Sequence, residues 1–195
     1  MAEVELPNTE ELEELRAKTF TKRVALVTAI FAVMLAISSL GGNYAMKEML
    51  LAQQQSSDQW AFYQAKVIRE HFYRNQKMRI EADLLERGST MKTEVRHHYE
   101  SLLKMMNEEE ARYHKEKQEI EQEAKKLEHE RDINRNKDPY FDYAEVLLQI
   151  SIVLASISIL AVSRPMFFFA VTVAALGALM SLNGFLLIFR LPFLH

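Results

Sequence analysis

Three long apolar stretches restrict the folds that this sequence can adopt. They are Val24–Ala45 (VALVTAIFAVMLAISSLGGNYA), Val146–Val162 (VLLQISIVLASISILAV) and Pro165–Phe189 (PMFFFAVTVAALGALMSLNGFLLIF). A helix of about 20 apolar residues crosses the hydrocarbon core of a bilayer. We therefore expect an all-α membrane protein with transmembrane helices at residues 24–45, 143–162 and 165–189. The first stretch starts late, after an acidic tail, so we interpret it as a retained span and not as a cleaved signal peptide.

The borders of the second and third stretches carry helix-start signals. Only Ser163 and Arg164 separate the two stretches, which predicts a tight antiparallel hairpin. Pro165 suits the first turn of a helix, where its missing N–H would have no partner. Asp138 followed by Pro139 predicts a cap and a first helical residue in the same way.

The segment between the first two stretches is charged and rich in helix-forming residues. Residues 46–142 contain a single glycine, Gly88, and a single proline, Pro139. This composition predicts an extramembrane helical hairpin arm, with helices at about 47–86 and 91–133 and a break at Gly88. Short tails remain at each end: residues 1–23, acidic and then basic, and residues 190–195.

A seven-residue repeat on the returning helix predicts a coiled-coil-like contact. The apolar row is Tyr99, Met106, Tyr113, Ile120 and Leu127. The row four residues further on is mostly polar: Leu103, Glu110, Lys117, Ala124 and Arg131. We expect a thin helix pair supported by neighbouring subunits; the alternative is a solvated single helix.

The orientation follows from the basic residues beside the spans. Lys and Arg within about 15 residues of the spans are equally numerous on the two sides, but on the N-terminal side they cluster and include the short turn at Arg164. We therefore expect a bacterial inner-membrane protein with a cytoplasmic N-terminus and a periplasmic arm, and the opposite orientation stays open.

Polar residues within the stretches are candidates for function. Four of them fall near the arm-side edge of the bilayer, by helix rise, and form a predicted polar collar: Asn43, Glu145, Gln149 and Asn183. We expect Asn183 and Gln149 to hydrogen-bond between helices; the alternative is a ring of Glu145 and Gln149 at the mouth of an oligomeric channel. A row of small residues predicts close helix packing: Ala170, Ala174, Gly177, Ala178, Ser181 and Gly184.

No pattern in the sequence indicates an enzyme. The chain has no cysteine, and Glu94 and His98 lack a third ligand at suitable spacing, so we expect no catalytic site, no cofactor and no metal. The net charge of −3 argues against nucleic-acid binding.

The segment SDQWAFYQAK (Ser57–Lys66) begins a helix that is apolar on two sides. Such a helix needs cover, and tryptophan and tyrosine favour the membrane interface. We therefore predict an interface that includes Trp60, Phe62, Tyr63, Val67 and Phe72.

The chain resembles a bacterial membrane family called domain of unknown function 4337. The resemblance rests on LLAQQQSSDQWAFYQAK (Leu50–Lys66), YHKEKQEIEQEAKKLEHERD (Tyr113–Asp132), LLQISIVLASISIL (Leu147–Leu160) and LNGF (Leu182–Phe185). It implies a three-span membrane protein and transfers no activity.

These observations favour a non-enzymatic, homo-oligomeric membrane protein with the arm as an assembly scaffold. Its expected partners are the lipid bilayer and further copies of the chain, with an additional membrane or periplasmic protein as a candidate. The alternative function is a channel or transport component lined by Glu145 and Gln149.

Overall fold

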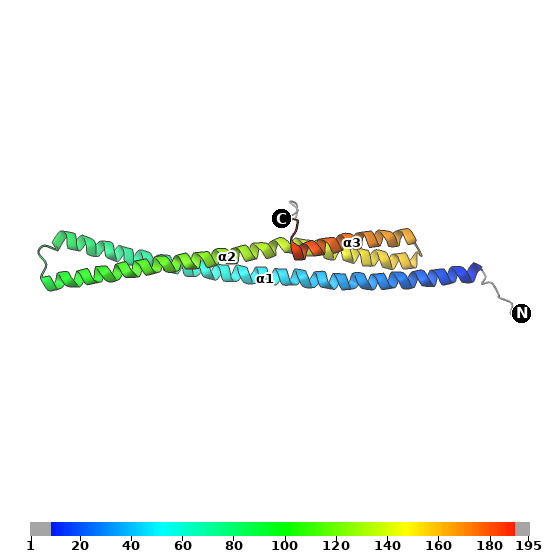
Figure 1. Ribbon diagram of the computed structural model, residues 1–195, viewed down its shortest axis with the longest axis horizontal. Coiled ribbons are helices and arrows are strands. Elements are labelled where there is room, and N and C mark those ends of the chain that lie inside the picture. The colour runs from blue at the N-terminus through cyan, green and yellow to red at the C-terminus, as the bar shows by residue number, and fades with distance from the viewer. Residues whose placement is uncertain (1–8, 190–195) are drawn as a thin grey trace. The chain divides into compact units, whose positions relative to one another are not determined.

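The structure is a computed structural model that describes residues 9–189, with side chains from residue 14 onward. It contains three helices: α1 (Thr9–Arg87), α2 (Thr93–Leu160) and α3 (Arg164–Leu186) (Figure 1). The described residues contain no β-strand. Each helix is long and apolar enough to cross a membrane. The predicted all-α class and the three apolar helices are confirmed; residues 1–8 and the C-terminal tail 190–195 lie outside the described residues.

Helix α1 is continuous through the predicted N-terminal tail, first membrane span and outgoing helix of the arm. The expected borders at residues 23 and 45 lie inside the helix, which begins at Thr9. Residues 9–87 contain no proline, so every backbone N–H is available to the helical hydrogen-bond pattern. The two glycines of α1, Gly41 and Gly42, are buried against Phe141. This close packing offsets the conformational entropy that glycine loses when it is fixed in a helix.

The prediction that a helix starts at Pro139 is wrong, because Pro139 lies inside α2. Proline removes one helical hydrogen bond, here the one to the carbonyl of Arg135. The next turn holds its place through tertiary packing, since Tyr140, Phe141 and Ala144 are all buried. Packing therefore outweighs the local helix-stop signal.

The ends of the helices differ slightly from the expected ones. Helix α2 ends at Leu160, and Val162 adopts a left-handed conformation with φ 45°. The N–H of Ser163 donates to the carbonyl of Ser158 at 3.1 Å, which closes the helix end as in a Schellman motif. Helix α3 ends at Leu186, three residues before the expected border.

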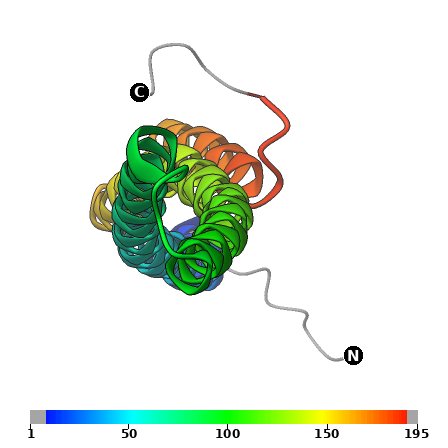
Figure 2. The ribbon, with the colours of Figure 1, turned by 90° about the vertical axis from the view of Figure 1, so that its left-hand side faces the viewer.

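A tight turn joins α1 to α2 at the expected glycine. A Cβ on Gly88 would lie 2.2 Å from the carbonyl oxygen of Leu84, so only glycine fits there. Helix α2 begins at Thr93, two residues later than predicted. Figure 2 looks onto this turn, where the chain crosses from α1 to α2.

The chain forms two compact units. Unit 1 comprises the residues up to Met49 together with those from Ile133 onward, and unit 2 comprises Leu50–Asp132. Unit 1 holds parts of all three helices, and unit 2 is an antiparallel pair formed by α1 and α2.

Small residues make up most of the interior of unit 1. Each helix presents one stripe to the others: Val24, Phe31, Ser38 and Ala45 on α1, Ala144, Leu148, Ser151, Ala155 and Ser158 on α2, and Ala170, Ala174, Gly177, Ser181 and Gly184 on α3. Large apolar side chains, including Leu40, Val153 and Phe169, are exposed on the outer surface. Small interior residues let helix backbones approach closely, and an apolar exterior matches a lipid environment.

Hydroxyl groups in unit 1 mostly bond within their own helix. Thr28, Ser151, Ser156 and Thr172 each donate to the carbonyl four residues earlier, at 2.7–3.0 Å. Two hydroxyls bond outside their own helix. That of Tyr140 on α2 donates to the Phe189 carbonyl at 2.8 Å. That of Ser38 donates to the Ser181 hydroxyl, also at 2.8 Å, and this hydrogen bond joins α1 to α3.

Phe141 occupies a socket walled by glycines. Its side chain is 2% exposed. A Cβ on Gly41 or Gly184 would lie 2.6 Å or 3.0 Å from the Phe141 ring. The ring also meets Phe185 edge to face, with centroids 4.8 Å apart. Glycine at these positions is therefore required for space.

Candidate functional site

The seven-residue repeat of α2 faces α1 in unit 2. Tyr113 and Leu127 are buried, and the other three residues of the apolar row, Tyr99, Met106 and Ile120, are partly buried. The second row also lies on this side: Ala124 is buried, and Leu103, Glu110, Lys117 and Arg131 are partly buried. Polar residues in such a row require polar partners on the facing helix.

Glu70 of α1 is the most buried charged residue of unit 2, with 2% of its side chain exposed. Lys117 Nζ lies 2.5 Å from its Oε2, and His114 Nδ1 lies 3.0 Å from its Oε1. A carboxylate only accepts hydrogen bonds, so Nδ1–H of His114 is the donor. Arg74 Nη2 lies 3.4 Å from Oε1, one helical turn further along α1. Three cationic or polar side chains thus surround one buried carboxylate.

Further ion pairs extend this network along the same seam. Glu110 accepts from Arg74 Nε and from Lys77 Nζ, both at 2.8 Å. Lys66, one turn before Glu70 on α1, pairs with Glu116 of α2. These contacts and the Glu70 cluster form the Glu70 network, which cross-links α1 and α2.

The carboxylates of the Glu70 network have lowered pKa values. Burial alone would raise the pKa of Glu70, but the close ion pair with Lys117 and the hydrogen bond from His114 outweigh it and hold the pKa below the ordinary value of 4.5. Hydrogen bonds from Lys77 and Arg74 lower the pKa of Glu110. A hydrogen bond from Lys66 does the same to the pKa of Glu116.

The lowered pKa values predict that acid weakens the helix pair. A carboxyl group with a depressed folded-state pKa stabilises fully above its unfolded value and loses that contribution as pH falls. We therefore expect the free energy of unfolding to be level above about pH 5 and to fall steadily below pH 4.5. Denaturant midpoints by circular dichroism, between about pH 3 and 7, measure this dependence.

Glu70→Gln should reduce the acid dependence of the unfolding free energy, with Glu110 and Glu116 still contributing, whereas Glu119→Gln should leave it unchanged. Glu119 serves as the matched control because its side chain is exposed and its pair with Lys115 is loose, at 3.8 Å. An equal change in both variants would show that the acid dependence comes from surface charge in general.

Aromatic contacts lie beside the network. Tyr113 stacks on Tyr73, with centroids 5.5 Å apart and planes 15° apart. Lys66 and Arg112 lie over the Tyr113 ring at 5.2 and 4.8 Å from its centroid, as in cation–π contacts. The seven-residue repeat predicted that Tyr113 lies in the helix contact, whereas no pattern in the sequence indicated Tyr73.

The predicted interface residues divide between two faces of α1. Trp60 Nε1 donates to Glu128 Oε1 on α2 at 2.9 Å, and its ring meets Tyr63 edge to face at 5.3 Å. Val67 is partly buried. In contrast, Phe62 and Phe72 are exposed. Trp60 and Tyr63 therefore belong to the helix pair, and the two phenylalanines point outward.

The residues of the predicted polar collar lie in different surroundings. Asn183 donates from Nδ2 to the Phe189 carbonyl at 2.8 Å and accepts from the Phe189 N–H at 2.9 Å. These two hydrogen bonds hold the chain after α3. Gln149 and Asn43 are exposed, and Glu145 is partly buried. The local turn at the end of α3 thus uses the Asn183 amide.

The predicted packing row of α3 is buried, apart from Ala178, which is partly buried. A Cβ on Gly177 would lie 3.1–3.2 Å from Leu148 and Leu147 of α2. Among the described residues, no group of three or more His, Asp or Glu side chains is placed to hold a metal ion. On the exposed surface of α2, Nδ1 of His97 lies 3.6 Å from Oε2 of Glu100.

Fold and site together define an all-helical protein with three helices apolar enough to span a membrane and a charged, cross-linked helix pair. The chain belongs to the family described as domain of unknown function DUF4337, whose model matches residues 20–187. The match confirms the family that the sequence motifs indicated. No curated protein and no solved structure gives a significant match to the chain.

Proposed function

We propose that the chain is a non-enzymatic, three-span integral membrane protein in which unit 2 is an extramembrane hairpin arm that binds a second copy. Apolar outer surfaces on the helices of unit 1 support the membrane assignment. The ion-pair network of unit 2 supports placement of this unit in water, because unpaired polar groups are costly in lipid. The clustered arginines support a cytoplasmic N-terminus and an arm on the opposite side of the inner membrane.

The observation that carries the assembly proposal is an apolar face on α1 that α2 leaves uncovered. Phe62, Ile68 and Phe72 are 59%, 69% and 55% exposed. Ala61 and Ala65, at helical spacing from these residues, are exposed beside them. We call this set the outer face; it lies away from Trp60, which bonds to α2, and from Tyr63, which meets the Trp60 ring. Contiguous exposed apolar residues in a water-facing segment mark a contact surface.

A second copy is the occupant that fits the outer face best. Homo-oligomers commonly use one self-complementary patch on each subunit, and a single helix pair is too thin to bury residues on both sides of α1. The side chains of the outer face carry no charge, so two copies can meet there without burying an unpaired ion.

The double variant Ile68→Ser, Phe72→Ser is expected to separate the copies. Burial of the two side chains is worth about 3 kcal/mol or more, so their loss should weaken association at least about a hundredfold. Light scattering of the purified protein in detergent measures the mass of the particle. We expect a multiple of 22.7 kDa for the original chain and 22.7 kDa for the variant.

Leu85→Ser is the matched control, because Leu85 is 90% exposed on the same helix but lies outside the outer face. This control should keep the oligomeric mass. A particle mass of one chain for the original protein, or an unchanged mass for the double variant, would contradict the proposal.

A further inference from the structure

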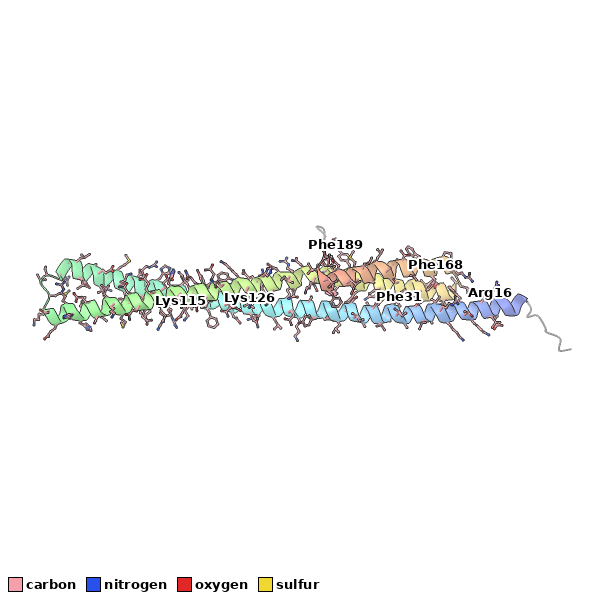
Figure 3. The ribbon with its side chains drawn as sticks, in the orientation of Figure 1. Arg16, Phe31, Lys115, Lys126, Phe168 and Phe189 are labelled. Carbon is pink, nitrogen blue, oxygen red and sulfur yellow. The ribbon has the colours of Figure 1, made fainter. Side chains whose placement is uncertain are left out.

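A cleft of about 500 Å³ lies in unit 1 between the N-terminal part of α1 and the beginning of α3. Two kinds of side chain line most of it: three arginines, Arg16, Arg23 and Arg164, and three phenylalanines, Phe20, Phe167 and Phe168. Figure 3 shows Arg16 on α1 and Phe168 on α3 toward the same end of this unit. Neither the helix pair nor the outer face of α1 includes any of these residues.

The three arginines bring three positive charges to one cleft. Arg16 and Arg23 are two helical turns apart on one face of α1, and Arg164 is the first residue of α3. No acidic side chain among residues 14–189 forms an ion pair with any of them, whereas the neighbouring Lys18 pairs with Glu14 at 2.7 Å. Like charges around one cleft repel each other, and an anion between them would reverse the sign of that interaction.

The start of α3 adds to the positive potential of the cleft. Ser163 makes no side-chain capping hydrogen bond, so its hydroxyl does not satisfy the first N–H groups of the helix. The N-terminus of a helix carries a partial positive charge. This partial charge and the Arg164 guanidinium act at the same end of α3.

The phenylalanines give the cleft an apolar wall. The rings of Phe20 and Phe167 meet edge to face, with centroids 6.0 Å apart, and connect α1 to α3. Phe168 stands beside Phe167 and is exposed. A small inorganic anion would leave this wall uncovered, whereas an amphiphilic anion would cover it with hydrocarbon.

The cleft also lies at the ends of the apolar stretches. Arg23 directly precedes the first stretch, and Arg164 lies between the second and third. In a three-span membrane protein this is the level of the lipid headgroups, where basic residues meet anionic lipids.

We propose that this cleft binds the phosphate group of an acidic phospholipid. The guanidinium groups of Arg16, Arg23 and Arg164 donate to the phosphate oxygens, for which their planar fork is well suited. An acyl chain lies along Phe167 and Phe168. The inference rests on the proposed membrane function but not on the proposed oligomer.

Lipid titration of the purified full-length protein in a neutral detergent tests the site. The probes are phosphatidylglycerol, phosphatidylcholine and inorganic phosphate, and the readouts are native mass spectrometry and the thermal midpoint. We expect phosphatidylglycerol to bind and raise the midpoint, with the other two probes much weaker. The double variant Arg16→Gln, Arg23→Gln should weaken the binding of phosphatidylglycerol at least tenfold, since the loss of one charge-assisted hydrogen bond to the phosphate alone costs about tenfold.

Lys18→Gln, Lys22→Gln is the matched control, because it removes the same charge from the same helix outside the cleft. This variant should bind phosphatidylglycerol nearly as the original chain does. Arg164→Gln provides an independent single variant on α3, and circular dichroism checks that each variant is folded. An equal loss in the lysine variant would overturn the site in favour of diffuse surface charge.

Two other outcomes separate the remaining explanations. Equal binding of phosphatidylcholine and phosphatidylglycerol would overturn recognition of the anion, and a full effect of inorganic phosphate would assign the cleft to a soluble phosphate compound. A protein that needs detergent but binds no lipid would refute this inference alone. A protein that is soluble without detergent would refute the membrane function as well.

Discussion

Phe141→Ala is expected to lower the free energy of unfolding of unit 1 by about 3 kcal/mol or more. The side chain is almost fully buried, and the glycines against its ring have no side chain with which to fill the space. Loss of the ring also removes the edge-to-face contact with Phe185. Thermal unfolding in detergent, followed by circular dichroism, measures the effect.

Phe169→Ala is the control for this prediction, because Phe169 is 60% exposed on α3. Its thermal midpoint should change little. Gly41→Ala should destabilise by about 1–3 kcal/mol through overpacking, and Phe141→Leu should relieve part of that loss. Equal midpoints for Phe141→Ala and Phe169→Ala would show that the socket does not hold the helices together.

Lys117→Met should destabilise the helix pair of unit 2 by about 2–3 kcal/mol. Removal of one partner of a buried pair leaves the other charge poorly compensated, and this is more harmful than loss of both. His114 and Arg74 still contact Glu70, which keeps the loss below the about 3–5 kcal/mol that is usual for a broken buried pair. Urea unfolding at neutral pH measures the change.

The double variant Glu70→Leu, Lys117→Met should recover most of this stability, because it leaves no buried ion behind. Lys115→Met is the control, since Lys115 lies on the same helix and is exposed. A double variant less stable than Lys117→Met would show that the pair itself, and not the orphaned charge, determines stability.

The apolar stretches predicted the helices more reliably than the local helix-start and helix-stop residues did. The stretches identified three apolar helices because hydrophobic length is a property of the sequence alone. Pro139 misled the prediction, because proline marks a helix start only where packing does not hold the next turn in place. Its neighbours Phe141 and Ala144 are held by residues distant in sequence, which no local pattern reports.

The candidate site was predictable in part for the same reason. The repeat on α2 identified the residues that face α1, including Glu110 and Lys117. Their partners, Arg74 and Glu70, are 36 and 47 positions away and lie in a charged sequence with many equivalent acids and bases. Polar residues in a seam signal that a partner exists, but only the register between the helices selects which one.

Hydroxyl groups that bond to their own helix make the surface of unit 1 less polar than its sequence indicates. Ser151, Ser156 and Thr172 contribute polar atoms to any hydropathy scale, yet each satisfies its own donor on its own helix. Lipid would therefore meet a surface closer to pure hydrocarbon than the residue names suggest. Ser38 and Ser181 are different, because a slide of α3 by one turn along α1 would separate their hydroxyls. This hydrogen bond therefore helps to fix the register of α3 along α1.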